Sequence, residues 1–283
     1  MHNEQERREL ARLHLDAVEI WLRRTINHEL TKAFGQDYWN AAYSADQQTI
    51  IPARIRDHAT KRQTAEPSRF KRPLDAITFN DAIDIVLHPR LFPEYFRQAL
   101  SAAFPNGSAE ARTYLSRLKS HRDQLAHGGI CSQRCLEQCT CYSNDVIDSL
   151  KAHFRERKME QIFNVPRFIR LIDNKGNDFS LDIENEHGHF IDCRTGGKGD
   201  VYIGDRLIIE VEVDESFSDF TIEWISFNDD RGSGKVATIA IEPKHVGIQM
   251  IVRFQLRSKE TWHRLHGGID DLLDIYYRVL PPI

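Results

Sequence analysis

The sequence predicts an α + β protein of two domains: an all-α helical bundle over residues 1–160, then an all-β sandwich over residues 161–283. The chain has 283 residues, which is long for one hydrophobic core and comfortable for two. Apolar residues recur every three or four positions in the first part and every second position in the second part. The charge balance changes at the same place, from 24 Lys and Arg against 21 Asp and Glu to 14 against 21.

Composition favours a globular, cytoplasmic protein. Hydrophobic residues make up 41% of the chain and charged residues 28%, which is typical of folded domains. No stretch approaches the roughly 18 apolar residues of a membrane span, and the opening residues MHNEQERREL lack the apolar core of a signal peptide. The first part carries +3 and the second −7, so any RNA is expected on the first part, because Lys and Arg bind phosphates by displacing counterions.

A long helix is predicted at the start of the chain. Asn3 and Glu6 have the spacing of a capping box, and an apolar stripe follows them. Residues 35–75 are polar and are predicted to form a loop interrupted by short helical pieces. The stripe consists of Leu10, Leu13, Ala17, Ile20, Trp21 and Phe34.

Helical spacing resumes in TFNDAIDIVL, where either Thr78 or Asn80 can cap the helix. It continues through LFPEYFRQALSAAF and is expected to stop at residues 105–107, which read Pro-Asn-Gly. A further helix is predicted from Ser108 to the glycines at 128 and 129. Its apolar positions are Tyr114, Leu115, Leu118 and Leu125.

The last predicted helix starts near Ser132 and contains three of the five cysteines. An odd number of cysteines, four of them within residues 131–141, does not suggest a secreted disulfide framework. A zinc site from Cys131, Cys135, Cys139 and Cys141 is one interpretation. Helical geometry instead places Cys139 and Cys141 about 200° apart and favours buried free thiols without a metal. The expected buried stripe is Cys135, Cys139, Tyr142, Val146, Leu150 and Phe154.

After about residue 164, seven segments of strand length alternate or run apolar and are separated by turn sequences. A β-sandwich fits this number of strands in roughly 115 residues best. The order GDRLIIEVEV, FTIEW, HVGIQMIVRFQL resembles immunoglobulin-like or PKD-like domains, with Trp224 at the middle of a strand as in their cores. The segments are RFIRLID, HGHFID, RLIIEVEV, FTIEWISF, VATIAIE, IQMIVRFQLR and LLDIYYRVL.

Two short motifs imitate nucleotide-dependent enzymes. HRD at residues 121–123 matches the start of a kinase catalytic loop, but the magnesium-binding Asn required five residues after the Asp is replaced by Gly128. GSGK at residues 232–235 lacks the first glycine of a phosphate-binding loop and is followed by Val236 instead of Ser or Thr. We therefore interpret the first as a chance match and the second as a hairpin turn.

RDQLAH, residues 122–127, sits near the end of a predicted helix and is followed by two glycines and the long helix CLEQCTCYSNDVIDSLKAHF. This RxxxxH pattern in a helical domain resembles the HEPN superfamily, and the resemblance covers roughly residues 35–158. It implies a helical bundle that often forms homodimers with the motifs facing each other. It also implies a metal-independent endoribonuclease activity without a cofactor, of the kind found in defence and toxin proteins.

The two motif residues suit this chemistry. Cleavage of RNA by its own 2′-hydroxyl requires proton transfer, which His127 can provide, and stabilisation of a phosphate that gains charge, which Arg122 can provide. The expected ends are a 2′,3′-cyclic phosphate and a 5′-hydroxyl. Asp123 lies four residues before His127 and is expected to orient its imidazole, although many family members have Asn there. Lys119 and His121 are further candidates for contacting RNA.

Helical geometry leaves two interpretations open. Five residues rotate by about 140°, so Arg122 and His127 share a site only if the glycines bend the helix end or a second chain completes it. The alternative is a non-catalytic interaction protein, in which Arg122 forms a surface ion pair and His127 interacts with the helix dipole. Its helical domain would dimerise or bind a nucleotide, and its sandwich would bind a partner. In either case the acidic sandwich is expected to recognise a protein or another ligand.

Overall fold

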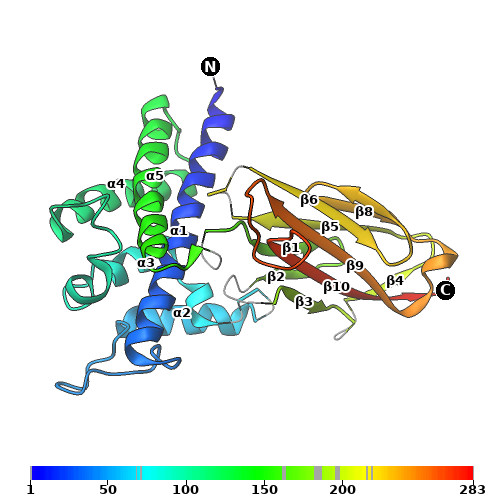
Figure 1. Cartoon of the computed structure of the whole chain (residues 1–283), viewed down its shortest axis with the longest axis horizontal. Helices are drawn as coiled ribbons and strands as arrows, with labels where there is room; N and C mark the ends of the chain where they lie inside the picture. The colour runs from blue at the N-terminus through cyan, green and yellow to red at the C-terminus, as the bar shows by residue number, and fades with distance from the viewer. Residues whose placement is uncertain are drawn as a thin grey trace. The chain divides into compact units, whose positions relative to one another are not determined.

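The structure is a computed structural model that describes residues 2–67, 69–70, 72–160, 164–181, 187–194, 198–214, 216–217 and 219–282. The chain divides into two compact units, Met1–Phe163 and Asn164–Ile283. Helices occupy the first unit and strands the second, which confirms the predicted α + β class (Figure 1). Within the described ranges, no helix is both long enough and apolar enough to cross a membrane.

Helix α1 (Glu4–Phe34) begins with the predicted capping box between Asn3 and Glu6. The predicted apolar stripe is partly wrong, because Leu13 is 40% exposed and the buried face includes Leu15 and Leu22. The physical reason is that α1 packs against several other helices of its unit and therefore buries a broad face instead of a narrow stripe.

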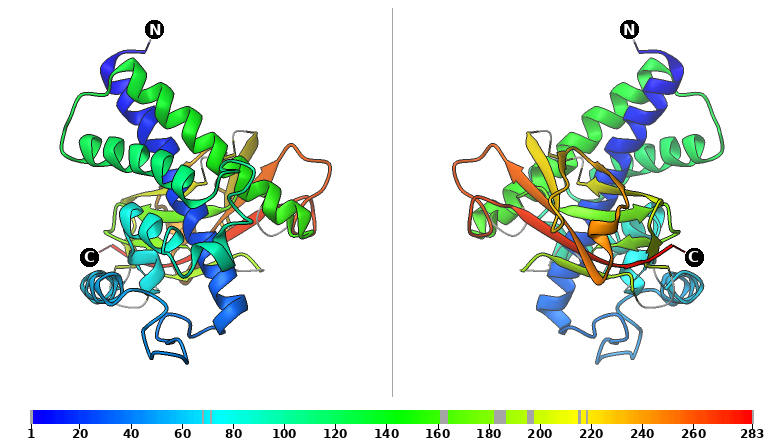
Figure 2. Two further views of the ribbon diagram at one scale, coloured as in Figure 1. Left: turned by 90° about the vertical axis from the view of Figure 1, so that its left-hand side faces the viewer. Right: turned by 90° about the vertical axis from the view of Figure 1, so that its right-hand side faces the viewer.

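Helix α5 (Gln133–Glu156) packs beside α1 in a parallel orientation (Figure 2). Near the start of both helices, Nε of Arg7 donates to the carbonyl of Cys131 at 2.8 Å. Near their ends, Nε2 of His153 lies 2.7 Å from Oε1 of Glu29, and both side chains are buried. These contacts set the register of the two longest helices.

The connection between α1 and α4 differs from the prediction in two places: it contains one helix longer than expected, and one predicted helix is replaced by a π-helical segment and turns. Helix α2 (Ala53–Ala65) replaces part of the predicted loop; it buries only Ile55 and Ala59, so its apolar face is too narrow to be recognised. A 3-10 turn, η1 (Pro73–Ala76), follows it. Thr78 caps α3 (Phe79–Val86). The next predicted helix is instead a π-helical segment, η2 (Phe92–Phe96), followed by turns.

The β unit contains all seven predicted strands and three additional short ones. One sheet has the order β2 (Asp178–Ser180), β1 (Phe168–Asp173), β5 (Arg206–Val213) and β8 (Val236–Ala240). The other has the order β3 (His189–Asp192), β10 (Asp271–Leu280), β9 (Gly247–Ser258), β6 (Phe220–Ser226) and β7 (Arg231–Ser233). Strand β4 (Asp200–Tyr202), like β3, pairs parallel to β10.

Alternate residues of both sheets share one hydrophobic core, as the period of two predicts. Trp224 is only partly buried and packs against this core instead of lying within it. The predicted hairpin at residues 232–235 is wrong, because β7 pairs with β6 in one sheet and β8 with β5 in the other. The chain passes from one sheet to the other after β7, and a Cβ at Gly232 would lie 2.5 Å from the Trp224 ring, so a larger residue there requires the ring to move. A 3-10 turn, η3 (Pro243–His245), precedes β9.

Candidate functional site

The motif RDQLAHGG occupies the C-terminal end of helix α4 (Ser108–Ala126). His127 is the C-cap residue, and Gly128 follows it in the left-handed conformation with φ +80°. The N–H of Gly129 donates to the carbonyl of Gln124 at 2.8 Å, and that of Gly128 donates to Leu125 at 3.3 Å. This is a Schellman motif, in which glycine is favoured because it has no Cβ. The helix therefore ends where the sequence predicts.

His127 is exposed at this helix end. Its backbone N–H donates to the carbonyl of Asp123 at 3.1 Å, which completes the last turn. Its imidazole makes no hydrogen bond or ion pair with any residue that the structure describes. The ring is therefore accessible to a substrate or to a second chain, and no described residue fixes its tautomer.

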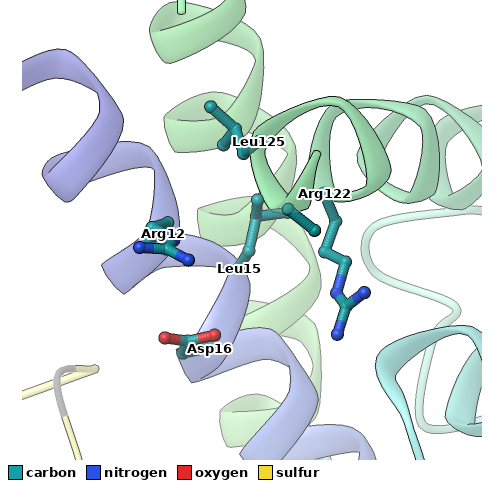
Figure 3. A pocket seen from close by; sticks show the side chains of 6 residues that line it. Arg12, Leu15, Asp16, Arg122 and Leu125 are labelled. Carbon is teal, nitrogen blue, oxygen red and sulfur yellow. The ribbon is translucent and has the colours of Figure 1, made fainter. Parts of the chain in front are cut away.

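Arg122 is partly exposed and lines a hollow of about 220 Å³ between α1 and α4, the α1/α4 hollow. Figure 3 shows Arg12 and Asp16 from α1 around it, with Arg122 from α4. Two arginines and one aspartate thus line this hollow, and in Figure 3 the guanidinium group of Arg122 points away from Arg12 and Asp16. The lining residues are Arg12, Leu15, Asp16, Arg122, Leu125 and Ala126.

Asp123 does not contact the imidazole of His127 within the described chain, although it was expected to orient it. One of its oxygens, Oδ1, accepts a hydrogen bond from Nδ2 of Asn80 in α3 at 3.2 Å. The same oxygen lies 3.8 Å from Nη1 of Arg122. In a single chain the carboxylate therefore lies beside the arginine of the motif, and within the described residues no hydrogen bond or ion pair joins Arg122 to His127.

Arg8 on α1 is a contributor that the sequence did not reveal. Its Nη1 donates to the carbonyl of Gly128 at 3.3 Å, and its Nη2 lies 3.5 Å from that of Leu125. A guanidinium group at a helix C-terminus satisfies free carbonyls and interacts favourably with the helix dipole. Arg8 thereby attaches the end of α4 to α1, next to His127.

The other two candidates, Lys119 and His121, separate. His121 lines a second hollow of about 310 Å³, which we call the α4/α5 hollow, with Arg117, Ser120, Arg134 and Gln138. Lys119 is partly buried on the same helix and lines neither hollow. Arg117 and His121 on α4 and Arg134 and Gln138 on α5 have a spacing of four, but the sequence alone does not tell that these two helix faces meet.

The cysteines follow the helical prediction. Cys131, Cys135 and Cys139 are buried, whereas Cys141 is exposed. Burial raises the pKa of the Cys139 thiol, and it raises that of Cys131 to about 11. In the part of the chain that the structure describes, no three His, Cys, Asp or Glu side chains are grouped to hold a metal ion.

Comparisons with models of known protein families, with curated proteins and with solved structures found no match for this chain. A function for this chain is therefore inferred from the geometry at the end of α4.

Proposed function

We propose that the helical unit is a metal-independent endoribonuclease of the HEPN type, active at the C-terminal end of α4. The observation that carries this proposal is that the motif arginine and the motif histidine are both accessible, at a helix end that a Schellman motif defines. Arg122 lines the α1/α4 hollow and His127 is exposed at the C-cap. Arg8 and Arg12 add positive charge from α1 beside them.

In this proposal each residue has a separate role. His127 removes the proton from the RNA 2′-hydroxyl, and the resulting alkoxide attacks the adjacent phosphorus as the bond to the 5′-oxygen breaks. Arg122 donates hydrogen bonds to the phosphate oxygens as their negative charge increases. The departing 5′-oxygen takes up a proton from water, and His127 returns the proton it removed to the solvent. The products are a 2′,3′-cyclic phosphate and a 5′-hydroxyl.

Arg122 and His127 of one straight helix point about 140° apart and do not form one site. A symmetric dimer would instead bring His127 of one chain towards Arg122 of the other. The exposure of apolar residues supports this arrangement. Ile130 is 70% exposed, three residues after His127, and Leu13 on α1 is the other exposed large hydrophobic residue in the described part of this unit. We therefore include a homodimer interface beside the motif in the proposal.

The β unit is proposed to recognise a protein partner or another ligand, so that the whole protein is an effector of the defence or toxin kind. Its net charge of −7 opposes binding to a phosphate backbone. RNA is accordingly assigned to the helical unit alone.

Cleavage assays with two point variants test the activity. The wild-type protein, Arg122→Ala and His127→Ala are incubated with single-stranded and structured RNA in the presence of a chelator. Arg97→Ala is the matched control, because Arg97 is also exposed on the helical unit. Either motif substitution is expected to lower the cleavage rate by about a hundredfold or more, and the control by less than about twofold. Equal products from all four proteins would contradict the proposal.

One observation favours a second candidate function, a non-catalytic adaptor that dimerises or binds a nucleotide. The ion pair of Arg122 with Asp123 and the hydrogen bond from Asn80 to Asp123 are those of a surface arginine with a structural role. Nucleotide or partner binding that survives Arg122→Ala and His127→Ala, without any cleavage by the wild type, would favour the adaptor.

A further inference from the structure

The α4/α5 hollow, lined by Arg117, Ser120, His121, Arg134 and Gln138, has the chemistry of an anion-binding site. Two guanidinium groups, a hydroxyl group, an imidazole and an amide line it, and none of the lining residues is acidic. The two guanidinium groups, the hydroxyl of Ser120 and the amide nitrogen of Gln138 can each donate a hydrogen bond to a phosphate oxygen. The hollow thus differs from the α1/α4 hollow, whose lining includes Asp16.

The positive charge at this hollow is not compensated. Nη1 of Arg117 donates to the neutral hydroxyl of Tyr142 at 3.0 Å. Arg134 is exposed and has no hydrogen bond or ion pair with any described residue. Arg122, by comparison, has the carboxylate of Asp123 at 3.8 Å. Arg117 and Arg134 therefore place two positive charges at the α4/α5 hollow, neither of them paired with a carboxylate of a described residue.

The hollow is also held in shape before a ligand arrives. Nε2 of His121 on α4 lies 2.9 Å from Oε1 of Gln138 on α5, which joins the two helices. The guanidinium group of Arg117 lies over the rings of Tyr114 and Tyr142, at 5.6 and 5.9 Å from their centroids. Such contacts limit the rotamers of Arg117 and reduce the entropy that binding must cost.

We propose that the α4/α5 hollow binds a backbone phosphate of single-stranded RNA, away from the phosphate that is cleaved. The RNA ligand rests on the proposed function, whereas the anion site rests on the residues just described. The hollow lies on a different side of α4 from Arg122, and Arg117 precedes Arg122 by about 7.5 Å along the helix. A strand that occupies both sites therefore has to cross the exposed surface of α4 between them.

Binding assays on a cleavage-deficient background test this site separately from the activity. The affinity of His127→Ala for a single-stranded RNA oligonucleotide is compared with that of the double variants that add Arg117→Ala, Arg134→Ala or Arg97→Ala. Arg134 and Arg97 are both exposed arginines, so their removal changes the net charge equally. We expect about tenfold weaker binding for Arg117→Ala and Arg134→Ala, and less than about twofold for Arg97→Ala.

The salt dependence of the affinity gives a second readout. The slope of the logarithm of the binding constant against that of salt concentration should decrease by about 0.7 when Arg134 is removed, because one phosphate contact is lost. Identical affinities and slopes for the Arg134→Ala and Arg97→Ala double variants would overturn the proposal. Thermal unfolding of each variant shows whether a loss of binding comes from misfolding, and Arg134→Ala is not expected to change it.

Competition experiments with inorganic phosphate, AMP and a polyglutamate peptide show which kind of anion the hollow binds. Each compound is added to the complex of the protein with the RNA oligonucleotide. Competition by phosphate or AMP as strong as that by the oligonucleotide would overturn the RNA assignment in favour of a small phosphate compound. Equal competition by polyglutamate would overturn it in favour of an acidic protein. RNA binding that depends on Arg117 and Arg134, in a protein that cleaves no RNA, would support this site and contradict only the proposed activity.

Discussion

Asn80 donates a hydrogen bond from Nδ2 to Oδ1 of Asp123 at 3.2 Å and so holds this carboxylate 3.8 Å from the guanidinium group of Arg122. The contact joins α3 to the last turns of α4. It places a negative charge beside the residue that is proposed to bind the scissile phosphate. Asp123 is therefore expected to weaken the binding of RNA.

Asp123→Asn should bind RNA more tightly. Removing one charge about 4 Å from Arg122 in a solvent-exposed setting corresponds to about 1 kcal/mol, or about fivefold in affinity. Titration of His127→Ala with and without Asp123→Asn measures this effect. Weaker binding, together with slower cleavage by Asp123→Asn on the wild-type background, would instead show that the carboxylate assists the site.

Gly128→Ala should impair cleavage more than it impairs folding. A side chain at φ +80° costs about 1 kcal/mol and disturbs the helix end that presents His127. Gly35→Ala is a second glycine variant, because Gly35 also ends a helix at a positive φ of +83° with open space around its Cβ position. It should lose more stability than Gly128→Ala in chemical denaturation, because its ψ of 179° lies in a region that only glycine adopts readily. Equal cleavage rates for the two variants would contradict a role for the α4 end.

Ile130→Asp should weaken self-association and cleavage together. Ile130 is 70% exposed beside His127, and a charge in an apolar interface would be buried without a partner. Ile248→Asp is the control, because Ile248 is 82% exposed and belongs to the β unit. Analytical ultracentrifugation measures the oligomeric state. A monomeric wild type, or unchanged association of Ile130→Asp, would remove the interface from the proposal.

Acid should destabilise the β unit through Asp271. Burial alone raises the pKa of this carboxyl group, but His189 at 3.4 Å and the charges of Arg167 and Arg264 outweigh burial and lower it to about 2. Because the folded pKa lies below the ordinary value of 3.8, the stabilisation is present above pH 4 and is lost as the pH falls towards 2. The pKa shift corresponds to a contribution of about 2 kcal/mol to the free energy of unfolding.

Denaturation between pH 5 and about pH 2 measures this dependence, with Asp219→Asn as the control, because Asp219 forms an exposed pair with Lys259. The wild type and the control should lose stability in parallel. Asp271→Asn should start less stable, because two buried arginines lose a partner, and should depend less on pH. The same pH dependence in all three proteins would exclude Asp271 as the cause.

The elements that the sequence predicted correctly have strong local signals. Asn3, Glu6 and Thr78 cap helices by contacts within one turn, and the glycines at 128 and 129 end α4 by a local hydrogen-bond pattern. Strand alternation is equally local, so all seven predicted strands are present. Helix α2 falls where short helical pieces were predicted, but its length was not recognised because it buries few apolar residues.

The surroundings of the motif depend on residues that are distant in sequence. Arg8 contacts Gly128 from the first helix, Arg12 of the same helix lines the hollow that Arg122 lines, and Asn80 contacts Asp123 from the third. Arg134 and Arg117 line the same hollow only because α5 packs on α4. A local sequence pattern cannot predict which distant residues come together in this way. The sequence therefore predicted the motif and the end of its helix, but not the charges around them.

The chemical identity of the cleaved ends tests the central claim most directly. An RNA oligonucleotide is compared with the same oligonucleotide that carries a single 2′-deoxy nucleotide at the cleaved position. The proposal predicts a 2′,3′-cyclic phosphate and a 5′-hydroxyl from the first substrate. It predicts no cleavage of the second substrate at that position, and no products from either with His127→Ala. Cleavage of the deoxy substrate at that position, or products with a 5′-phosphate, would contradict attack by the 2′-hydroxyl and the assigned roles of Arg122 and His127.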